Sequence, residues 1–337
     1  MSPTSKTRHI TSDTDSSSNG LLLEAKDLVK VFPVKRGVFG RVTGGIRAVD
    51  GVSIGIRRGE VYGLVGESGC GKTTLGRMLL RLIELTSGSV FFDGSDITKL
   101  DRKGMQPFRR RMQVIFQDPF GSLNPRKTIG SIIGEPLRII RSDSKEVLSG
   151  IQEMIGLVGL SPDSSERYPH EFSGGQRQRI GIARALILRP QFLVADEPVS
   201  ALDVSIQAQI LNLLMELKTK LGLTILFISH DLRVVRSLCD RLAVMYLGRV
   251  VEEGTAEDLY ASPVHPYTDE LIRAIPEPDP ELRRQSQGIK GEVPNPADPP
   301  PGCSFHPRCP LAEDICRREI PELTGRYPGH RAACHVR

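Results

Sequence analysis

Short apolar runs, each followed by polar or glycine-rich residues, recur along the first three quarters of the chain. Three of them cover Glu60–Val65, Gln191–Glu197 and Thr224–Ile228. Runs that are apolar almost throughout are typical of strands buried on both faces of a parallel sheet. The pattern from Thr74 to Ile83 indicates a helix. We therefore predict an α/β fold whose parallel core begins at the first strand and resumes near Gln191.

Two regions differ from this core. Residues 21–65 read as short strands, some of them antiparallel, with a glycine-rich insertion at Gly37–Gly45. Residues 119–190 read as mainly helical, and the last helix runs from Ser173 to Pro190. We predict an antiparallel β subdomain and a helical subdomain beside the parallel core.

Composition narrows the class of protein. The chain has 337 residues, is 39% hydrophobic and carries a formal net charge of +5. No apolar run approaches the roughly 20 residues of a membrane-spanning helix. Residues 1–20 are rich in Ser, Thr and Asp and lack the apolar centre of a signal peptide, so we expect a disordered tail. The mild charge does not favour nucleic-acid binding. We expect a cytosolic protein that forms no pore itself.

The most informative motif follows the first predicted strand. Residues 66–73 read Gly-Glu-Ser-Gly-Cys-Gly-Lys-Thr, a complete P-loop. Its glycines let backbone N–H groups turn towards an anion, Lys72 faces the β- and γ-phosphates, and Thr73 offers a hydroxyl to Mg²⁺. The following helix directs its N-terminal dipole at the phosphates. A plain glycine-rich turn would not explain Lys and Thr at these offsets, so the motif predicts nucleotide binding.

Two carboxylates end the strand at 191–197. Asp196 is expected to emerge beside the P-loop, where Mg²⁺ needs an anchor. Glu197 is expected to act as the general base that accepts a proton from the attacking water or orients that water. A solvated turn is the alternative for such a pair, and the apolar run before it argues against that reading.

The order of the motifs resembles the nucleotide-binding subunits of ATP-binding-cassette (ABC) transporters. After the P-loop come Gln117, the signature Phe172-Ser173-Gly174-Gly175-Gln176, the Asp196–Glu197 pair, Asp203 of the D-loop and His230. The resemblance covers about Leu21 to Gly254, and the signature begins with Phe where Leu is commoner. It implies a P-loop NTPase cassette with a RecA-like parallel sheet, an antiparallel β subdomain and a helical subdomain.

The resemblance also assigns roles. Gln117 would contact Mg²⁺ and the attacking water, His230 would contact the γ-phosphate, and Phe32 would stack on adenine. Taken alone, a His after a strand or a Phe within one is more often structural. The Mg²⁺ ligands would be Thr73, Gln117 and Asp196. The residues expected to contact ATP are Phe32, Gly66, Glu67, Ser68, Gly69, Cys70, Gly71, Lys72, Thr73 and Thr74.

Ser173, Gly174 and Gly175 open the last helix of the helical region. A helix N-terminus with small residues is a second phosphate-binding surface. In the family two subunits dock head to tail, so ATP would lie between the P-loop of one subunit and Ser173–Gln176 of the other. ATP would then join the subunits and hydrolysis would release them.

The C-terminal part resembles a narrower branch. His265-Pro266-Tyr267-Thr268 precedes a short predicted helix, a proline-rich linker at 276–280 and 299–301, and four cysteines. This pattern resembles the C-terminal extension of oligopeptide and dipeptide importer ATPases, and Phe32–Lys35 with the glycine-rich insertion resembles their F-type ATPase. We expect a tail at residues 1–20, an ATPase domain at 21–260 and an extension at 261–337.

The four cysteines are Cys303, Cys309, Cys316 and Cys334, spaced C-x5-C-x6-C-x17-C. A reducing cytosol disfavours disulfides, and thiols clustered in a segment with little core of its own suggest a metal staple. The spacing matches neither paired CxxC zinc sites nor a common ferredoxin. The resemblance implies a [4Fe–4S] cluster, with zinc or free structural thiols as alternatives. His306 and His335 are alternate ligands or surface residues.

The remaining cysteines lie in the cassette. Cys239 reads as a core residue. Cys70 lies inside the P-loop, and we expect its alkylation to impair ATP binding.

These observations favour the ATP-hydrolysing subunit of a di- or oligopeptide importer at the cytoplasmic face of a bacterial plasma membrane. The expected partners are a sister ATPase in a heterodimer (or a second copy in a homodimer), two permease subunits and an extracytoplasmic solute-binding protein, with no nucleic acid. Nickel or glutathione is an alternative solute. A soluble non-transport ABC ATPase is a further alternative, although such proteins usually carry two cassettes or long coiled-coil insertions.

Overall fold

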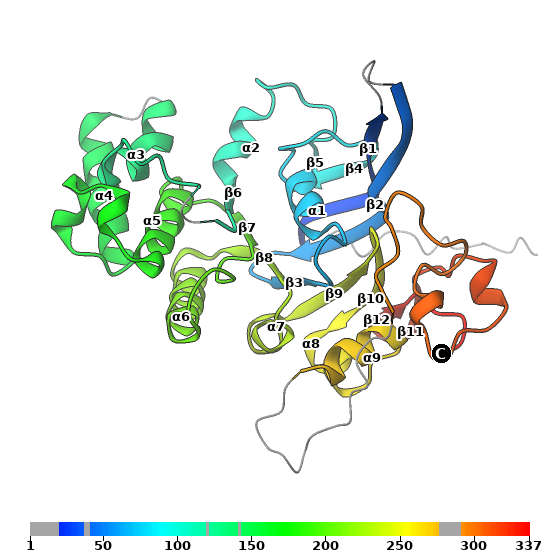
Figure 1. Ribbon diagram of the computed structural model, residues 1–337. Coiled ribbons are helices and arrows are strands. Elements are labelled where there is room, and N and C mark those ends of the chain that lie inside the picture. Colours follow the sequence, from blue (N-terminus) through cyan, green and yellow to red (C-terminus); the bar gives the residue numbers. More distant parts are fainter. Residues whose placement is uncertain (1–19, 37–40, 119–120, 141–142, 276–290) are drawn as a thin grey trace, which may run out of the picture.

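The computed structural model describes residues 20–36, 41–118, 121–140, 143–275 and 291–337 (Figure 1). The predicted N-terminal tail therefore lies outside the described residues, apart from Gly20. So do residues 37–40, the first part of the glycine-rich insertion, and the linker at 276–280. Within the described part of the chain, no helix is long and apolar enough to cross a membrane.

The larger sheet of the described residues has eight strands in the order β11-β12-β10-β9-β3-β8-β7-β6. Its parallel centre consists of β9 (Arg241–Tyr246), β3 (Val61–Val65), β8 (Thr224–Ser229), β7 (Phe192–Asp196) and β6 (Met112–Ile115).

Successive residues of these strands enter two separate cores. Val61 and Val65 of β3 pack into the core on the side of the helical region. Tyr62 and Leu64 pack into the core shared with α1 and the antiparallel sheet. Because both faces are covered, the strands are apolar throughout, as the sequence predicted.

Helices cover both sides of the parallel centre. Helix α1 (Lys72–Leu79) buries Leu75 and Met78 beneath the antiparallel sheet, and α6 (Val204–Leu221) packs on the opposite face. Helix α1 begins two residues before the predicted Thr74 and ends well before Ile83. The helix stops because Arg81 adopts a left-handed conformation, with φ of 52°.

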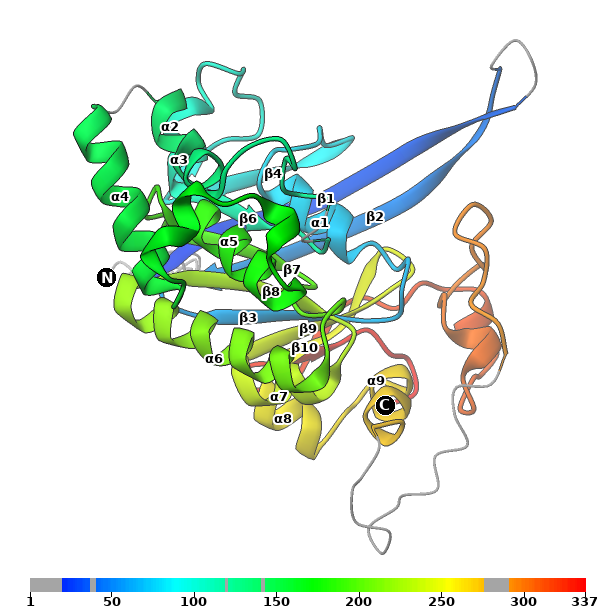
Figure 2. The ribbon, with the colours of Figure 1, turned by 60° about the vertical axis from the view of Figure 1, so that its left-hand side comes forward.

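The smaller sheet has the order β2-β1-β4-β5. It comprises β1 (Leu21–Arg36), β2 (Arg41–Arg57), β4 (Ser87–Phe92) and β5 (Ser95–Asp96). The prediction of short strands was wrong here, since β1 and β2 form one long hairpin (Figure 2). Gly44 and Gly45 do not end the pairing: Gly45 lies opposite Pro33, and a Cβ on it would stand 2.5 Å from a methyl group of Val31.

The helical region follows β6 and stands apart from the parallel sheet in Figure 1. It contains α3 (Ile129–Ile139), α4 (Ser144–Leu157) and α5 (Gly174–Leu186), after the short α2 (Gln106–Arg111) of the core. Side chains such as Ile133, Ile151 and Ile182 fill its interior. Helix α5 ends at Leu186, earlier than the predicted Pro190.

The C-terminal part completes the larger sheet. After α7 (Leu232–Leu238), the chain forms β10 (Arg249–Thr255), α8 (Ala256–Ala261), α9 (Pro266–Arg273), β11 (Thr324–Tyr327) and β12 (His330–Ala332). Strand β12 pairs with β10 and places Ala332 opposite Glu252. His330 Nε2 lies 2.7 Å from Glu252 Oε1, and both side chains are buried. The last residues are thus joined to the cassette by strand pairing and by this buried contact, and they do not form a separate unit.

Candidate functional site

The P-loop connects β3 to α1 and packs closely against two other strands, β9 and β2. Gly66 and Gly71 have φ values of 150° and 107°, which favour glycine. A Cβ at Gly66 would lie 2.2 Å from the carbonyl oxygen of Met245, and one at Gly71 would lie 2.0 Å from that of Ala48. Larger residues therefore cannot replace these glycines without moving β9 or β2.

Lys72 is the first residue of α1. The N-cap before it is Gly71, so no side chain caps the N–H groups of the first turn. The Lys72 side chain is buried, and Nζ donates to the carbonyl oxygens of Gly66 (2.7 Å) and Glu67 (2.9 Å). The helix N-terminus and this ammonium group together form a cationic cradle of the kind that binds phosphates.

Thr73 and Asp196 meet at the end of β7. The Thr73 hydroxyl donates to Asp196 Oδ1 at 2.9 Å, and Asp196 is 4% exposed. Burial raises the pKa of the Asp196 carboxyl, while the Thr73 hydrogen bond opposes that rise. A hydroxyl and a carboxylate are the hard oxygen ligands that Mg²⁺ prefers, so the pair fits a Mg²⁺ ion.

Two predicted residues converge on one oxygen atom of a third. Gln117 Nε2 donates to Glu197 Oε2 at 3.0 Å, and His230 Nδ1 lies 3.3 Å from the same Oε2. The three follow the neighbouring strands β6, β7 and β8, whose carboxyl ends share one edge of the sheet. The sequence-predicted side chains therefore assemble next to the P-loop.

Glu197 has an unusual backbone. Its φ is 45°, a conformation that non-glycine residues rarely adopt. Its N–H donates to the carbonyl oxygen of Ile228 on β8 at 3.0 Å, which holds the turn in place. Backbone strain of this kind persists where the surroundings fix it and is frequent at functional sites. The side chain is 14% exposed, against 58% for His230, so the site opens to solvent on the histidine side.

The signature residues lie at the start of α5. The Ser173 hydroxyl accepts from the N–H of Gln176, whose side chain accepts from the N–H of Ser173. These bonds form a capping box that closes within its own turn. A Cβ at Gly175 would stand 2.5 Å from Ile206 of α6, which explains that glycine. Asp203, the N-cap of α6, is exposed. The structure does not bring this surface to the P-loop of the same chain (Figure 1).

Phe32 lies on β1 of the long hairpin. Its side chain is 40% exposed, and Lys30 Nζ is 5.1 Å from the centroid of its ring. The ring is therefore accessible to a planar partner.

Sequence reasoning missed two residues that hold the P-loop. The Tyr267 hydroxyl accepts from the N–H of Glu67 at 2.9 Å. Arg308 forms a bidentate pair with the Glu67 carboxylate, at 2.7 and 3.0 Å. Tyr267 stood in a motif that the sequence singled out for its family resemblance alone. Nothing local to Arg308 indicated a partner 241 residues away.

The cysteines fall into two groups. Cys70 and Cys239 are buried in the cassette, and Cys239 is a core residue as predicted. Burial raises the pKa of the Cys70 thiol. Alkylation of Cys70 is therefore expected to be slow, because the reactive thiolate is scarce and enclosed, and the prediction that it impairs ATP binding stays a prediction.

In the C-terminal group, Cys316 and Cys334 are buried while Cys303 and Cys309 are half-buried. Burial, and then the neighbouring thiols, raise the pKa of Cys303 to about 11. Among the described residues, no group of three or more His, Cys, Asp or Glu side chains that could hold a metal ion is found.

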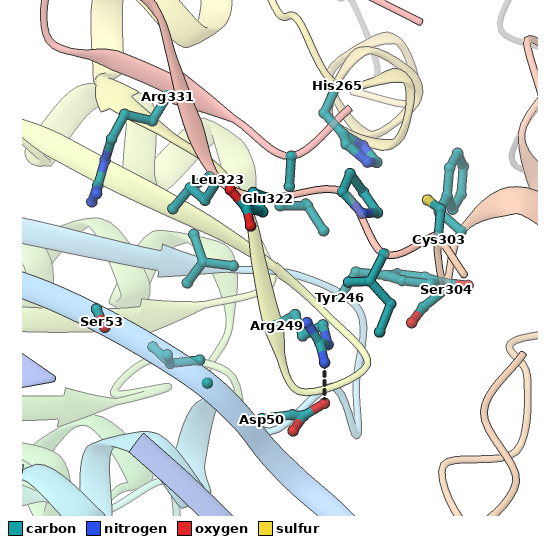
Figure 3. Close-up of a pocket in the computed structure, with 18 of the residues that line it drawn as sticks. Asp50, Ser53, Tyr246, Arg249, His265, Cys303, Ser304, Glu322, Leu323 and Arg331 are labelled. Atoms are coloured by element: carbon teal, nitrogen blue, oxygen red, sulfur yellow. Dashed lines mark hydrogen bonds and ion pairs between the residues drawn. The ribbon is translucent and has the colours of Figure 1, made fainter. Parts of the chain in front are cut away.

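A cavity of about 370 Å³ lies between β2, β10 and the C-terminal segment (Figure 3). Its walls include Tyr246, His265 and Cys303, and the Asp50–Arg249 ion pair, at 2.6 Å, stands beside it. No P-loop residue lines this cavity, so it is separate from the phosphate cradle.

A phosphate cradle, a hydroxyl–carboxylate pair suited to Mg²⁺ and an oriented Glu197 define a P-loop nucleoside triphosphatase. The ABC transporter family model matches residues 49–200, and the model of the oligopeptide/dipeptide transporter C-terminal region matches residues 251–316.

Similar proteins agree with this class. A relative from Brucella ovis is 58% identical over 290 residues, which cover 86% of this chain and 92% of the relative. The oligopeptide transport ATP-binding protein AppF of Bacillus subtilis is 51% identical over 319 residues, covering 94% of this chain and 97% of its own. The dimeric ATP-binding cassette MJ0796, in a post-hydrolysis state bound to ADP and Pi, is 29% identical, with 69% of this chain and 98% of that chain covered and a TM-score of 0.62.

The chain belongs to the ABC transporter family, as an ATP-binding subunit with the C-terminal region of the oligopeptide/dipeptide branch. The predicted family and fold class are confirmed, and the protein is an ATP-hydrolysing transporter subunit.

Proposed function

We propose that this subunit binds and hydrolyses ATP to drive the import of di- or oligopeptides, working at the cytoplasmic face of a bacterial plasma membrane. The convergence of Gln117 and His230 on Glu197 carries the hydrolytic part of the proposal. The peptide part is supported by the C-terminal region and by the transport role in the name of the Bacillus relative. Nickel and glutathione are less favoured solutes, and a non-transport ATPase is disfavoured by the same matches.

The residues divide the work of hydrolysis. Lys72 and the start of α1 hold the β- and γ-phosphates, and Thr73, Asp196 and Gln117 would hold a Mg²⁺ ion, which would supply charge neutralisation. Glu197 orients the attacking water and accepts its proton, since general bases work within hydrogen-bond reach of their substrate. His230 contacts the γ-phosphate from the solvent side. Phe32 stacks on adenine.

The second half of each ATP site comes from another cassette. Ser173–Gln176 and Asp203 lie on a surface that the P-loop of the same chain does not meet, and Val204 next to them is 82% exposed. A sister subunit in a heterodimer, or a second copy, would cover this surface and complete two composite sites. Two permease subunits and an extracytoplasmic solute-binding protein would complete the importer.

A groove beside the helical region offers a surface for a permease. It has a volume of about 680 Å³ and is lined by Pro136, Ile139, Ile140 and Leu188 with Arg109 and Arg110 among the polar residues. Ile139 is 73% exposed. The groove presents apolar side chains that a permease helix would cover.

The test is purification of the tagged chain from membranes, with its partners identified by mass and labelled-peptide uptake measured in vesicles. We expect permeases, a second ATPase and ATP-dependent uptake. Recovery without permeases, or with ribosomes or DNA-repair proteins, would contradict the proposal. Ile139→Asp is expected to lose the permeases while retaining ATP binding, whereas Leu148→Asp, at another exposed apolar position outside the groove, keeps them.

The C-terminal cysteines support a second proposal, an iron–sulfur cluster. The three other thiols all act on the pKa of Cys303, so the four lie within electrostatic reach of one another. Buried thiols with raised pKa values become thiolates only beside a strong positive charge. A zinc ion would gather sulfurs to about 3.8 Å apart, from Zn–S bonds of about 2.3 Å. A group of this kind that could hold a metal ion is not found among the described residues, so the proposal rests on the electrostatic reach of the four thiols and on the matched C-terminal region.

Metal analysis of anaerobically purified protein tests this proposal independently of activity. We expect iron, acid-labile sulfide and a visible absorption band, lost in Cys316→Ser and kept in Cys239→Ser. Stoichiometric zinc without iron, or no metal at all, would contradict the cluster.

A further inference from the structure

Glu67, the second residue of the P-loop, is held at three separate points. Its N–H donates to the Tyr267 hydroxyl at 2.9 Å, and its carbonyl oxygen accepts from Lys72 Nζ at 2.9 Å. Its carboxylate accepts two hydrogen bonds from Arg308. Two of these three anchors belong to the C-terminal part of the chain. The position of the phosphate loop therefore depends on residues far outside the cassette motifs.

The Arg308 side chain is itself held in place by burial and by neighbouring aromatic residues. Its side chain is 5% exposed, and Nη1 also lies 3.3 Å from the Tyr246 hydroxyl. Three residues earlier, the ring of Phe305 packs 5.3 Å from the rings of both Tyr246 and Tyr267. A bidentate guanidinium–carboxylate pair is strongly directional, so Arg308 can hold only one arrangement of Glu67.

The contact between Arg308 and Glu67 pairs two opposite charges next to the phosphate site. Glu67 places a carboxylate in a loop whose backbone surrounds a triphosphate, and like charges repel at such short range. Arg308 supplies the compensating positive charge at the carboxylate, whereas Lys72 contacts the carbonyl oxygen of Glu67 and stays available for the phosphates. Without Arg308, the negative charge of Glu67 would oppose ATP binding.

We propose that Arg308 is a positioning residue of the ATP site, which neutralises Glu67 and fixes the P-loop for nucleotide binding. The proposal rests on the P-loop as the ATP site of the proposed function. Because Arg308 lies between Cys303 and Cys309, any change that reorganises the cysteine-bearing segment also reaches the nucleotide site. The C-terminal extension is thereby part of the nucleotide-binding machinery.

Equilibrium binding of a fluorescent ATP analogue to the purified full-length chain tests the proposal. We expect Arg308→Ala to raise the Kd about tenfold, which corresponds to about 1.4 kcal/mol. Adding Glu67→Gln to that variant should return most of the lost affinity, because the neutral amide needs no compensating charge. Arg308→Lys should show a smaller loss. Arg337→Ala, which breaks an exposed ion pair with Asp269 in the same segment, is the matched control and should leave the Kd unchanged.

The outcomes separate the two proposals. If the wild-type chain does not bind the analogue, the assignment of the ATP site fails. If the wild type binds and Arg308→Ala binds equally well, the role of Arg308 is overturned while the ATP site stands. A purely structural role would lower the melting temperature and affinity without rescue by Glu67→Gln, and that result also overturns the proposal. Should Arg308→Ala not fold, Arg308→Lys with and without Glu67→Gln carries the same comparison.

Discussion

The polar side chains at the carboxyl ends of the parallel strands and those of the C-terminal segment are held in different ways. At the strand ends, Gln117 is exposed and His230 is 58% exposed, and their contacts with Glu197 can be exchanged for contacts with a ligand. In the C-terminal segment, His330 and Arg308 are almost completely buried and paired. Exposed, exchangeable contacts suit chemistry, whereas buried pairs suit support. Substitutions in the two regions should therefore affect different quantities.

The largest effect on folding is expected from His330→Ala. The change leaves Glu252, which is fully buried, without one of its partners, and breaking a buried pair costs about 3 kcal/mol. Urea unfolding should show this loss in the free energy of unfolding. His335→Ala, which removes a half-buried histidine whose ring contacts the carbonyl oxygen of Glu319, is the control and should change the stability much less. Equal losses in both variants would contradict the supporting role of the buried pair.

A large effect on binding without a comparable loss of folding is expected from Lys72→Ala. Hydrogen bonds to charged groups contribute about 1.5–3 kcal/mol, which corresponds to a roughly 10- to 100-fold rise in the Kd for ATP. Lys220→Ala, at an exposed position of α6, provides the comparison. If both variants bound ATP equally well, the phosphate cradle would lie elsewhere.

The smallest effect concerns Cys70. Its thiol is 4% exposed, and burial raises its pKa, so little thiolate is present near neutral pH. Iodoacetamide should label Cys70 much more slowly in the folded chain than in the unfolded chain. The rate should keep rising with pH beyond the range of an ordinary thiol, because only the thiolate reacts. Mass spectrometry would contradict this account if both states reacted at the same rate.

The same contrast explains what the sequence could predict. Asp196 and Glu197 stand at the end of an apolar strand, so the local pattern was enough to single out that pair, whereas Gln117 and His230 were assigned through the family resemblance. The contact of Arg308 with Glu67 depends on the packing of segments far apart in the chain, which no local pattern encodes. The long β1–β2 hairpin was missed because its glycines suggested a break, although cross-strand pairing continues through Gly44 and Gly45.

The most direct test of the account is single-turnover ATP hydrolysis by Glu197→Gln, with ATP binding measured on the same sample. The substitution keeps the shape of the side chain and removes the base, and general bases contribute about 10²- to 10⁴-fold to a rate. The account predicts retained ATP affinity, loss of hydrolysis by about that factor and a longer-lived ATP-bound dimer. Unchanged turnover, or equal loss of binding and turnover, would contradict the assignment of Glu197 as the base.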